Sequence, residues 1–190
     1  MQENKTISNS TSFVLASKVK DYFQLIKFTL SFMVVFSTVV SFLIAPYHLI
    51  YTRSTLLSVL LLFVAGMLIT GSANSINQVL EKHTDAIMKR TAKRPVASGR
   101  MSENEAYIFA FITGVIGVGM MWYFFNLQSA LIGLFSLFLY GFIYTPLKKI
   151  NSVAVLVGAI PGALPCLIGW VAATDEFSIG GWILFGIQFI

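Results

Sequence analysis

The chain has 190 residues, of which 56% are apolar and only 11% are charged. So few charged side chains cannot cover a water-soluble protein of this size, which excludes an ordinary soluble globule. The formal net charge is +5, but positive loops are usual in membrane proteins, so we expect no nucleic-acid partner. The apolar blocks are long and do not alternate with polar residues, which predicts an all-α, polytopic transmembrane helical bundle.

The chain begins with a polar segment followed by a short basic one. Residues 1–17 are rich in Ser and Thr and lack the order of regions that a signal peptide has, so we interpret them as a flexible cytoplasmic tail. Residues 18–27, KVKDYFQLIK, are amphipathic and basic, which is typical of a helix on the membrane surface. We therefore assign residues 18–190 to a single transmembrane domain surrounded by lipid.

Five apolar segments approach the length of about 20 residues that crosses a bilayer. They cover residues 28–45, 55–76, 106–125, 129–144 and 152–173. A candidate capping box from Ser102 to Glu105 precedes the third segment, and Asn126 marks a tight connection to the fourth. Pro161, Pro165 and several glycines in the fifth predict a helix that is kinked or partly unwound.

The last apolar segment, residues 179–190, is too short to cross a bilayer at 1.5 Å per residue. We expect it to be the first part of a sixth span that continues in a longer protein.

Lys and Arg are distributed unequally between the two sides of these spans. If the spans alternate in direction, twelve of the thirteen lie on the side of the N-terminus, and only Arg53 lies on the other. The positive-inside rule therefore predicts that the N-terminus and the polar loop of residues 74–102 are cytoplasmic.

That loop contains a regular series of oxygen-bearing side chains. Asn77, Glu81 and Asp85 are four residues apart, and each step of four advances by only about 40° around an α-helix, so they share one face. Two carboxylates and an amide oxygen suit Mg²⁺, which commonly binds one or two carboxylates together with phosphate oxygens. The spacing thus predicts one side of a site for a metal ion and a phosphate group.

A basic cluster follows this series. Arg90 and Arg94 are again four residues apart, and if the helix continues to Pro95 they form a pair suited to a diphosphate group. The alternative is that these acids and bases pair with one another in a solvated loop, where exposed ion pairs contribute little. The residues alone leave both interpretations open.

Two sequence blocks resemble a known superfamily. Residues 77–99, NQVLEKHTDAIMKRTAKRPVASG, are similar to the motif N-x-x-x-D-x-x-x-D followed by R-T-x-x-R-P-x-x-x-G of the intramembrane UbiA-type prenyltransferases. Within that superfamily, residues 144–170, YTPLKKINSVAVLVGAIPGALPCLIGW, resemble the protohaem IX farnesyltransferase (haem O synthase) family. Glu81 stands where the pattern has Asp. The resemblance covers residues 18–190.

The resemblance implies a nine-helix bundle in the bacterial inner membrane. Its expected reaction transfers the farnesyl group of farnesyl diphosphate to a vinyl group of haem b, with Mg²⁺ as cofactor and haem A synthase as a partner. Asn77, Glu81 and Asp85 are the implied metal ligands, and with Arg90 and Arg94 they form the expected catalytic set. Lys89 and Lys148 are further candidates for binding the diphosphate.

The resemblance also implies a second acidic motif after Ile190. We therefore expect this chain to carry half of the active site and to be inactive alone. Two alternatives remain: another prenyltransferase of the superfamily that acts on a quinone precursor, and a non-enzymatic, transporter-like membrane protein whose fifth span lines a permeation path.

Overall fold

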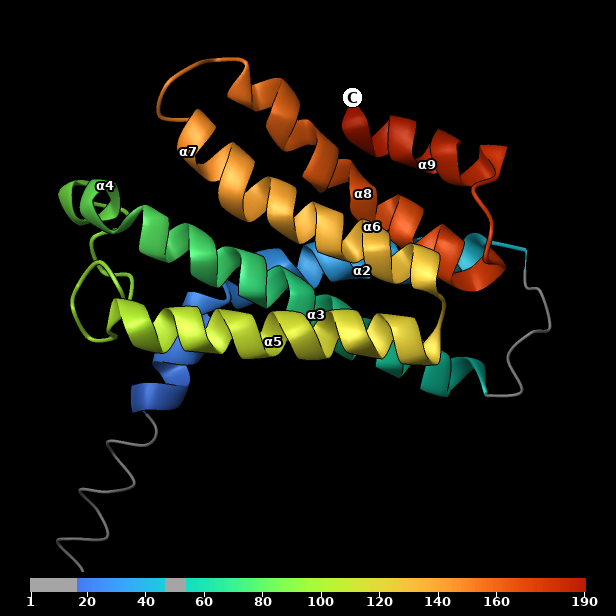
Figure 1. Cartoon of the computed structure of the whole chain (residues 1–190), viewed down its shortest axis with the longest axis horizontal. Helices are drawn as coiled ribbons and strands as arrows, with labels where there is room; N and C mark the ends of the chain where they lie inside the picture. Colours follow the sequence, from blue (N-terminus) through green and yellow to red (C-terminus); the bar gives the residue numbers. More distant parts are fainter. Residues whose placement is uncertain (1–16, 47–53) are drawn as a thin grey trace, which may run out of the picture.

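The computed structural model describes residues 17–46 and 54–190, and every regular element in these ranges is a helix (Figure 1). The longer helices are α2 (Phe28–Ile44), α3 (Thr55–Leu80), α5 (Glu103–Phe124), α6 (Leu127–Phe138) and α8 (Ala154–Thr174). The shorter elements are a helix at Ser17–Leu25, α4 (Lys82–Ile87), the π-helix η1 (Leu139–Tyr144), α7 (Thr145–Leu147) and α9 (Ile179–Phe189). The all-α prediction is confirmed, whereas residues 1–16 of the predicted tail lie outside the described ranges.

The predicted spans correspond to these helices. Among the described residues, four helices are long and apolar enough to cross a membrane: α3, α5, α8 and the run Leu127–Leu147 that α6, η1 and α7 form together. The helix Ser17–Leu25 and α2 make a fifth candidate, with a bend of 51° between them. The final predicted segment is the short helix α9 of 11 residues.

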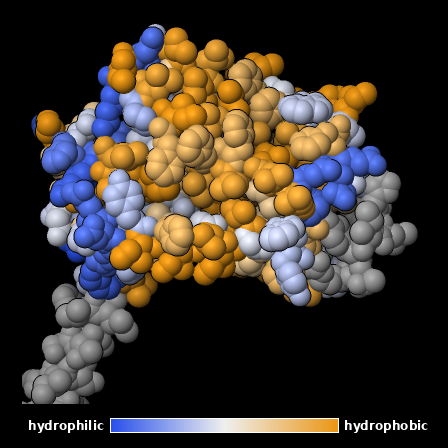
Figure 2. All heavy atoms as spheres, in the orientation of Figure 1, coloured by the Kyte–Doolittle hydropathy of each residue, from blue (hydrophilic) through white to orange (hydrophobic). Residues whose placement is uncertain are grey.

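α3 occupies the centre of the bundle. It packs along α5 and against α2 and α6, while α8 contacts α2, α6 and α9. Small residues allow the close approach of α3 and α5: a Cβ atom on Gly117 would lie only 3.0 Å from the backbone nitrogen of Ile69. Apolar side chains cover the visible flank of the bundle, and hydrophilic ones gather at the end that carries α4 (Figures 1 and 2). This distribution is that of a membrane protein with a polar end.

Short polar side chains cap the N-terminal ends of α5 and α6. Ser102 Oγ accepts a hydrogen bond from the backbone N–H of Glu105 (3.1 Å), and Asn126 Oδ1 accepts one from that of Ser129 (2.7 Å). Only the serine half of the predicted capping box forms, because the Glu105 carboxylate instead accepts from Lys18 Nζ (2.9 Å) and from Tyr22 (3.0 Å). Helix Ser17–Leu25 is thereby attached to the first turn of α5.

The irregular span is the fourth and not the fifth. α8 is one continuous α-helix with Pro161 and Pro165 inside it, so of the two forms predicted for the fifth span, the partly unwound one is wrong. The fourth span, predicted as an ordinary helix, contains the π-helix η1 instead. π-helical turns are uncommon and are frequent at functional sites.

Candidate active site

The three predicted oxygen ligands lie where α3 ends and α4 begins. Asn77 is in the last turn of α3, Glu81 is the residue between the two helices, and Asp85 is on α4. The Glu81 N–H donates to the Asn77 carbonyl (3.0 Å) and the Asp85 N–H to the Glu81 carbonyl (2.8 Å), so the four-residue register continues through the break. All three residues are buried, with exposed fractions of 0%, 7% and 4%.

Each of these side chains contacts a different cationic group. Lys27 Nζ donates to Asn77 Oδ1 (2.7 Å), Lys148 Nζ lies 2.8 Å from Glu81 Oε1, and Arg94 Nη1 lies 2.6 Å from Asp85 Oδ2. Arg94 Nη1 also lies 4.0 Å from Glu81 Oε2. The three cations come from separate segments: the start of α2, the end of α7 and the loop after α4. Two buried negative charges therefore face three positive ones.

The chain after α4 does not continue as a helix. α4 ends at Ile87, and residues 88–100 form turns, with Gly99 in the left-handed region at a φ of 76°. The predicted helical pairing of Arg90 with Arg94 is therefore wrong. One reason is local, since the Thr91 hydroxyl donates to the Asp85 carbonyl (3.0 Å) and satisfies it at the helix end.

The two arginines consequently differ in position. Arg94 folds back onto the acids, whereas Arg90 is exposed and forms no ion pair with any residue that the structure describes. Lys89 is exposed as well. The structure thus brings Asn77, Glu81 and Asp85 together with Arg94 and Lys148, and leaves Arg90 and Lys89 on the outside of the loop.

Lys27 is a site residue that the sequence interpretation missed. It lies in the bend before α2 with a left-handed φ of 49°. Two side chains of α3 stabilise this bend: Gln78 Nε2 donates to the carbonyls of residues 24 and 25 (both 2.9 Å), and Asn74 Nδ2 donates to that of residue 26 (3.2 Å). The sequence did show that Asn74 and Gln78 are one helical turn apart. It could not show which backbone carbonyls their side chains would bind.

Lys27 is partly buried among two cations and two carboxylates. Burial, reinforced by the positive charges of Arg94 and Lys148, lowers the pKa of Lys27 to about 8, against the opposing influence of Glu81 and Asp85. Its ammonium group therefore loses its proton at a lower pH than that of an exposed lysine.

The fourth span contributes two stacked aromatic rings and a buried hydroxyl. Lys148 Nζ lies 5.2 Å from the centre of the Tyr144 ring, which stacks on Tyr140 at 5.4 Å. Thr145 is fully buried and accepts a hydrogen bond from Asn77 Nδ2 (3.1 Å). The π-helix and α7 therefore connect directly to the series of oxygen ligands.

An apolar cavity of about 140 Å³ lies between α2, α3, α6 and α8. Leu30, Val35, Leu62, Ile69, Pro161 and Ile168 are among the residues that line it. It reaches Asn74, one helical turn from Asn77, and Tyr140 on η1. The cavity suits a hydrocarbon chain whose polar end lies at the buried acids.

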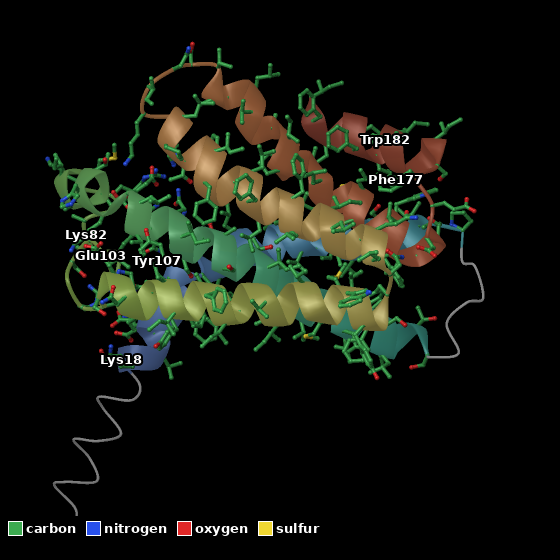
Figure 3. The ribbon with its side chains drawn as sticks, in the orientation of Figure 1. Lys18, Lys82, Glu103, Tyr107, Phe177 and Trp182 are labelled. Atoms are coloured by element: carbon green, nitrogen blue, oxygen red, sulfur yellow. The ribbon has the colours of Figure 1, made fainter. Side chains whose placement is uncertain are left out.

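A second group of polar contacts fastens the loop after α4. Arg100 donates to Asp21 Oδ1 and Gln24 Oε1 (both 2.9 Å) and to the carbonyl of Lys93 (3.0 Å). Figure 3 shows Lys82 and Glu103 close together at the same end of the bundle, where their side chains lie 2.8 Å apart. The contacts of Arg100 fix the segment from which Arg94 reaches the acids.

Few side chains at this site could bind a metal ion. In the described part of the chain, no three His, Cys, Asp or Glu residues form a cluster suited to a metal ion. Two carboxylates and one amide oxygen remain, and each already contacts a cationic group. Such a set suits a hard divalent cation that takes further oxygens from a phosphate group and water.

Comparison with known proteins identifies the family. Residues 34–190 match the UbiA prenyltransferase family. The chain belongs to this family. UbiA-family relatives named protohaem IX farnesyltransferase include one from Flavobacterium psychrophilum, 40% identical over 92% of this chain and 57% of that protein. Another, from Flavobacterium johnsoniae, is 43% identical over 89% of this chain and 55% of that protein. The chain thus spans little more than half the length of either relative.

Solved structures share the UbiA-family fold. The chain resembles digeranylgeranylglyceryl phosphate synthase with a TM-score of 0.77 and 22% identity, over 91% of this chain and 59% of the other. It resembles a UbiA homologue from Archaeoglobus fulgidus bound to GPP and Mg²⁺ with a TM-score of 0.66 and 17% identity, over 89% of this chain and 58% of the other. With its apolar helices, this UbiA-family chain is an integral membrane protein.

Proposed function

We propose that the protein carrying this chain transfers the farnesyl group of farnesyl diphosphate to a vinyl group of haem b and so makes haem O. The observation that carries the proposal is the buried series Asn77, Glu81 and Asp85, which faces three cations beside an apolar cavity. The names of relatives at 40% and 43% identity support haem b over a quinone precursor as the acceptor.

In this proposal, Asn77 Oδ1 and the carboxylates of Glu81 and Asp85 hold Mg²⁺, as their oxygen chemistry suits. The bound ion would withdraw negative charge from the diphosphate and make it a better leaving group. A homologue of the same fold is bound to GPP and Mg²⁺, which supports Mg²⁺ as the cofactor.

The cations on these oxygens would then bind the diphosphate. Arg94, Lys148 and Lys27 need to move only from a carboxylate or amide oxygen to a phosphate oxygen at the same site. Positive groups fixed around the leaving group stabilise the charge that develops as it departs. Arg90 and Lys89 lie on the exposed side of the loop. We propose that they bind the diphosphate oxygens that face away from the buried acids.

The bond changes balance without a redox partner. The C1–O bond of farnesyl diphosphate breaks, and the diphosphate leaves with the electron pair. The vinyl π-electrons of haem b form the new bond to C1, and water adds to the remaining vinyl carbon and loses a proton. This leaves a hydroxyethylfarnesyl group, and the apolar cavity would keep other water from the farnesyl chain.

We further propose that the polar end of the bundle is cytoplasmic and that the membrane is the bacterial inner membrane. The basic residues at this end agree with the positive-inside rule. Farnesyl diphosphate would then reach the site from the cytoplasm, and haem A synthase would receive the haem O.

The test is an assay of the complete protein in detergent with haem b, farnesyl diphosphate and Mg²⁺, followed by chromatography of the haems. We expect haem O to form, and chelation of Mg²⁺ to prevent it. Asp85→Asn should abolish formation, while Glu103→Gln, which changes an acid outside the series, should retain it.

Two results would contradict the proposal. Prenylation of an aromatic acid in place of haem b would assign the protein to the quinone branch of the family. Full activity of the Asp85→Asn variant would exclude Asp85 as a metal ligand.

A further inference from the structure

The hydroxyl group of Thr145 occupies a decisive position next to Asn77. Thr145 follows the π-helix η1 directly, and both its backbone N–H and its Oγ1 hydroxyl donate to the carbonyl of Tyr140, the latter at 2.8 Å. With its proton directed there, Oγ1 can only accept further hydrogen bonds. Thr145 has an exposed fraction of 0%, so water does not compete for this oxygen.

This arrangement fixes which end of the Asn77 amide faces which neighbour. Asn77 Nδ2 donates to Thr145 Oγ1 (3.1 Å), and Asn77 Oδ1 accepts from Lys27 Nζ (2.7 Å). An ammonium group only donates, so the atom that faces Lys27 has to be oxygen. Thr145 and Lys27 thus impose the same amide orientation from opposite sides.

Metal binding would remove one of these two constraints. A cation on Asn77 Oδ1 would take the place of Lys27, so of these two side chains Thr145 alone would still orient the amide oxygen toward the metal site. An asparagine amide can turn about its last torsion angle at little cost when its neighbours allow it. The turned amide would present an NH₂ group, which repels a metal ion.

We propose that Thr145 is a positioning residue that keeps the Asn77 amide oxygen directed at the metal site. The inference rests on the proposed function, because it takes Asn77 as a metal ligand. Thr145 itself touches neither metal nor substrate. It acts through Asn77. The Tyr140 carbonyl of the π-helix accepts the hydroxyl proton of Thr145 and so leaves its oxygen to accept from Asn77.

Metal binding by the complete protein tests this role without any turnover. The probe is Mn²⁺, followed by electron paramagnetic resonance in the presence of inorganic pyrophosphate. Thr145→Val keeps the side-chain shape and removes the hydroxyl, and it should weaken Mn²⁺ binding about tenfold or more, as losses of groups that orient metal ligands do. Thr145→Ser keeps the hydroxyl and should bind within about twofold of the unaltered protein.

An Asn77→Asp background separates orientation from general support of the fold. A carboxylate has two equivalent oxygens, so a turn of the side chain no longer matters. Adding Thr145→Val to Asn77→Asp should therefore change Mn²⁺ binding by less than about twofold. Equal losses in both backgrounds would assign Thr145 a merely structural role and overturn the proposal.

The remaining outcomes are equally decisive. Unchanged Mn²⁺ binding by Thr145→Val overturns the positioning role and leaves the proposed function intact. An unaltered protein that binds no Mn²⁺ with pyrophosphate overturns the metal site and this inference with it. If Thr145→Val does not fold, Thr145→Ala takes its place, with Thr145→Ser as the matched control.

Discussion

Glu81 and Asp85 are carboxylates with exposed fractions of only 7% and 4%, and such burial is costly unless each charge is compensated. Lys148 and Arg94 provide that compensation at 2.8 and 2.6 Å. In the proposed complex the same cations would also bind the diphosphate, so each would neutralise a carboxylate in the free protein and the diphosphate when it is bound. Loss of either cation is therefore expected to affect both stability and turnover.

Arg94→Gln tests this dual role. It removes the cation nearest to Asp85 and should reduce haem O formation about 100-fold or more, in the range seen when one charge-stabilising group is lost. It should also lower the free energy of unfolding by about 3 kcal/mol, because Asp85 stays buried without its partner. The measurements are kcat and thermal unfolding in detergent.

Lys93→Gln is the matched control, because Lys93 is an exposed cation one residue away. It should change kcat by less than about twofold. Equal losses in the two variants would mean that the net charge of the loop matters and the contact of Arg94 with Asp85 does not.

Local periodicity predicted some of these residues and could not predict others. Asn77, Glu81 and Asp85 were recognisable because a spacing of four defines a helix face without reference to the rest of the fold. Lys27 and Thr145 contact Asn77 from 50 and 68 residues away. No local pattern encodes these contacts, which depend on a left-handed bend before α2 and on the π-turn in the fourth span.

At the scale of elements, the start of α3, the cap at Ser102 and the tight connection at Asn126 agree with the sequence prediction. Apolar length and capping chemistry are properties of a short segment, so the sequence carries them directly. The form of α8 was harder to predict. Its prolines remove backbone hydrogen bonds, but packing against α2, α6 and α9 keeps the helix continuous.

The contact of α8 with α2 depends on Gly169. A Cβ atom there would collide with the carbonyl oxygen of Thr38 and lie 3.0 Å from the nitrogen of Phe42. Gly169→Ala should therefore separate the two helices and lower the free energy of unfolding by about 1–3 kcal/mol. Thermal unfolding in detergent measures the loss.

Gly119→Ala is the comparison, because no described residue outside the neighbouring turns of α5 lies within 4 Å of a Cβ atom at Gly119. Alanine is the better helix former by up to about 1 kcal/mol, so this variant should be as stable as the unaltered protein or more so. A Gly169→Ala variant that unfolds at the same temperature as Gly119→Ala would show that α2 and α8 adjust freely.

The loop after α4 carries the exposed basic residues Lys89, Arg90 and Lys93, and Arg100 fastens it to helix Ser17–Leu25. Arg100→Met should free the loop, because Asp21 and the Lys93 carbonyl lose their donor. We expect trypsin to cut between residues 89 and 94 several-fold faster, as followed by mass spectrometry.

Lys82→Met removes a single exposed ion pair at the same end and should leave this cleavage rate unchanged. If both variants are cut at the rate of the unaltered protein, other contacts hold the loop and Arg100 does not.

At the scale of the whole molecule, the bundle is polarised along its length. α4, its loop and α7 lie together at one end, and the connection between α8 and α9 lies at the other (Figure 1). The first end carries the buried acids and most of the cations that face them, while the other connection carries Asp175 and Glu176. From this asymmetry the positive-inside rule predicts that the first end is cytoplasmic.

Cysteine labelling tests the orientation. Cys166 is buried, and a Cys166→Ala background allows single cysteines to be placed at the exposed positions Lys93 and Glu176. In intact spheroplasts, a membrane-impermeant maleimide should label Glu176→Cys and should reach Lys93→Cys only after the membrane is opened. The reverse pattern would place the acids outside the cell and exclude a cytoplasmic diphosphate donor.

The hydrogen bonds from Glu81 to Asn77 and from Asp85 to Glu81 have a consequence for how this sequence can diverge. An exchange that keeps a carboxylate in place leaves this register intact, and Glu81, which stands where the resembled motif has Asp, is such an exchange. The number of residues cannot change. One inserted or deleted residue between Asn77 and Asp85 would turn the last carboxylate by about 100° about the helix axis, away from the other two oxygens. We therefore expect related sequences to show conservative substitutions in this segment but no insertions or deletions.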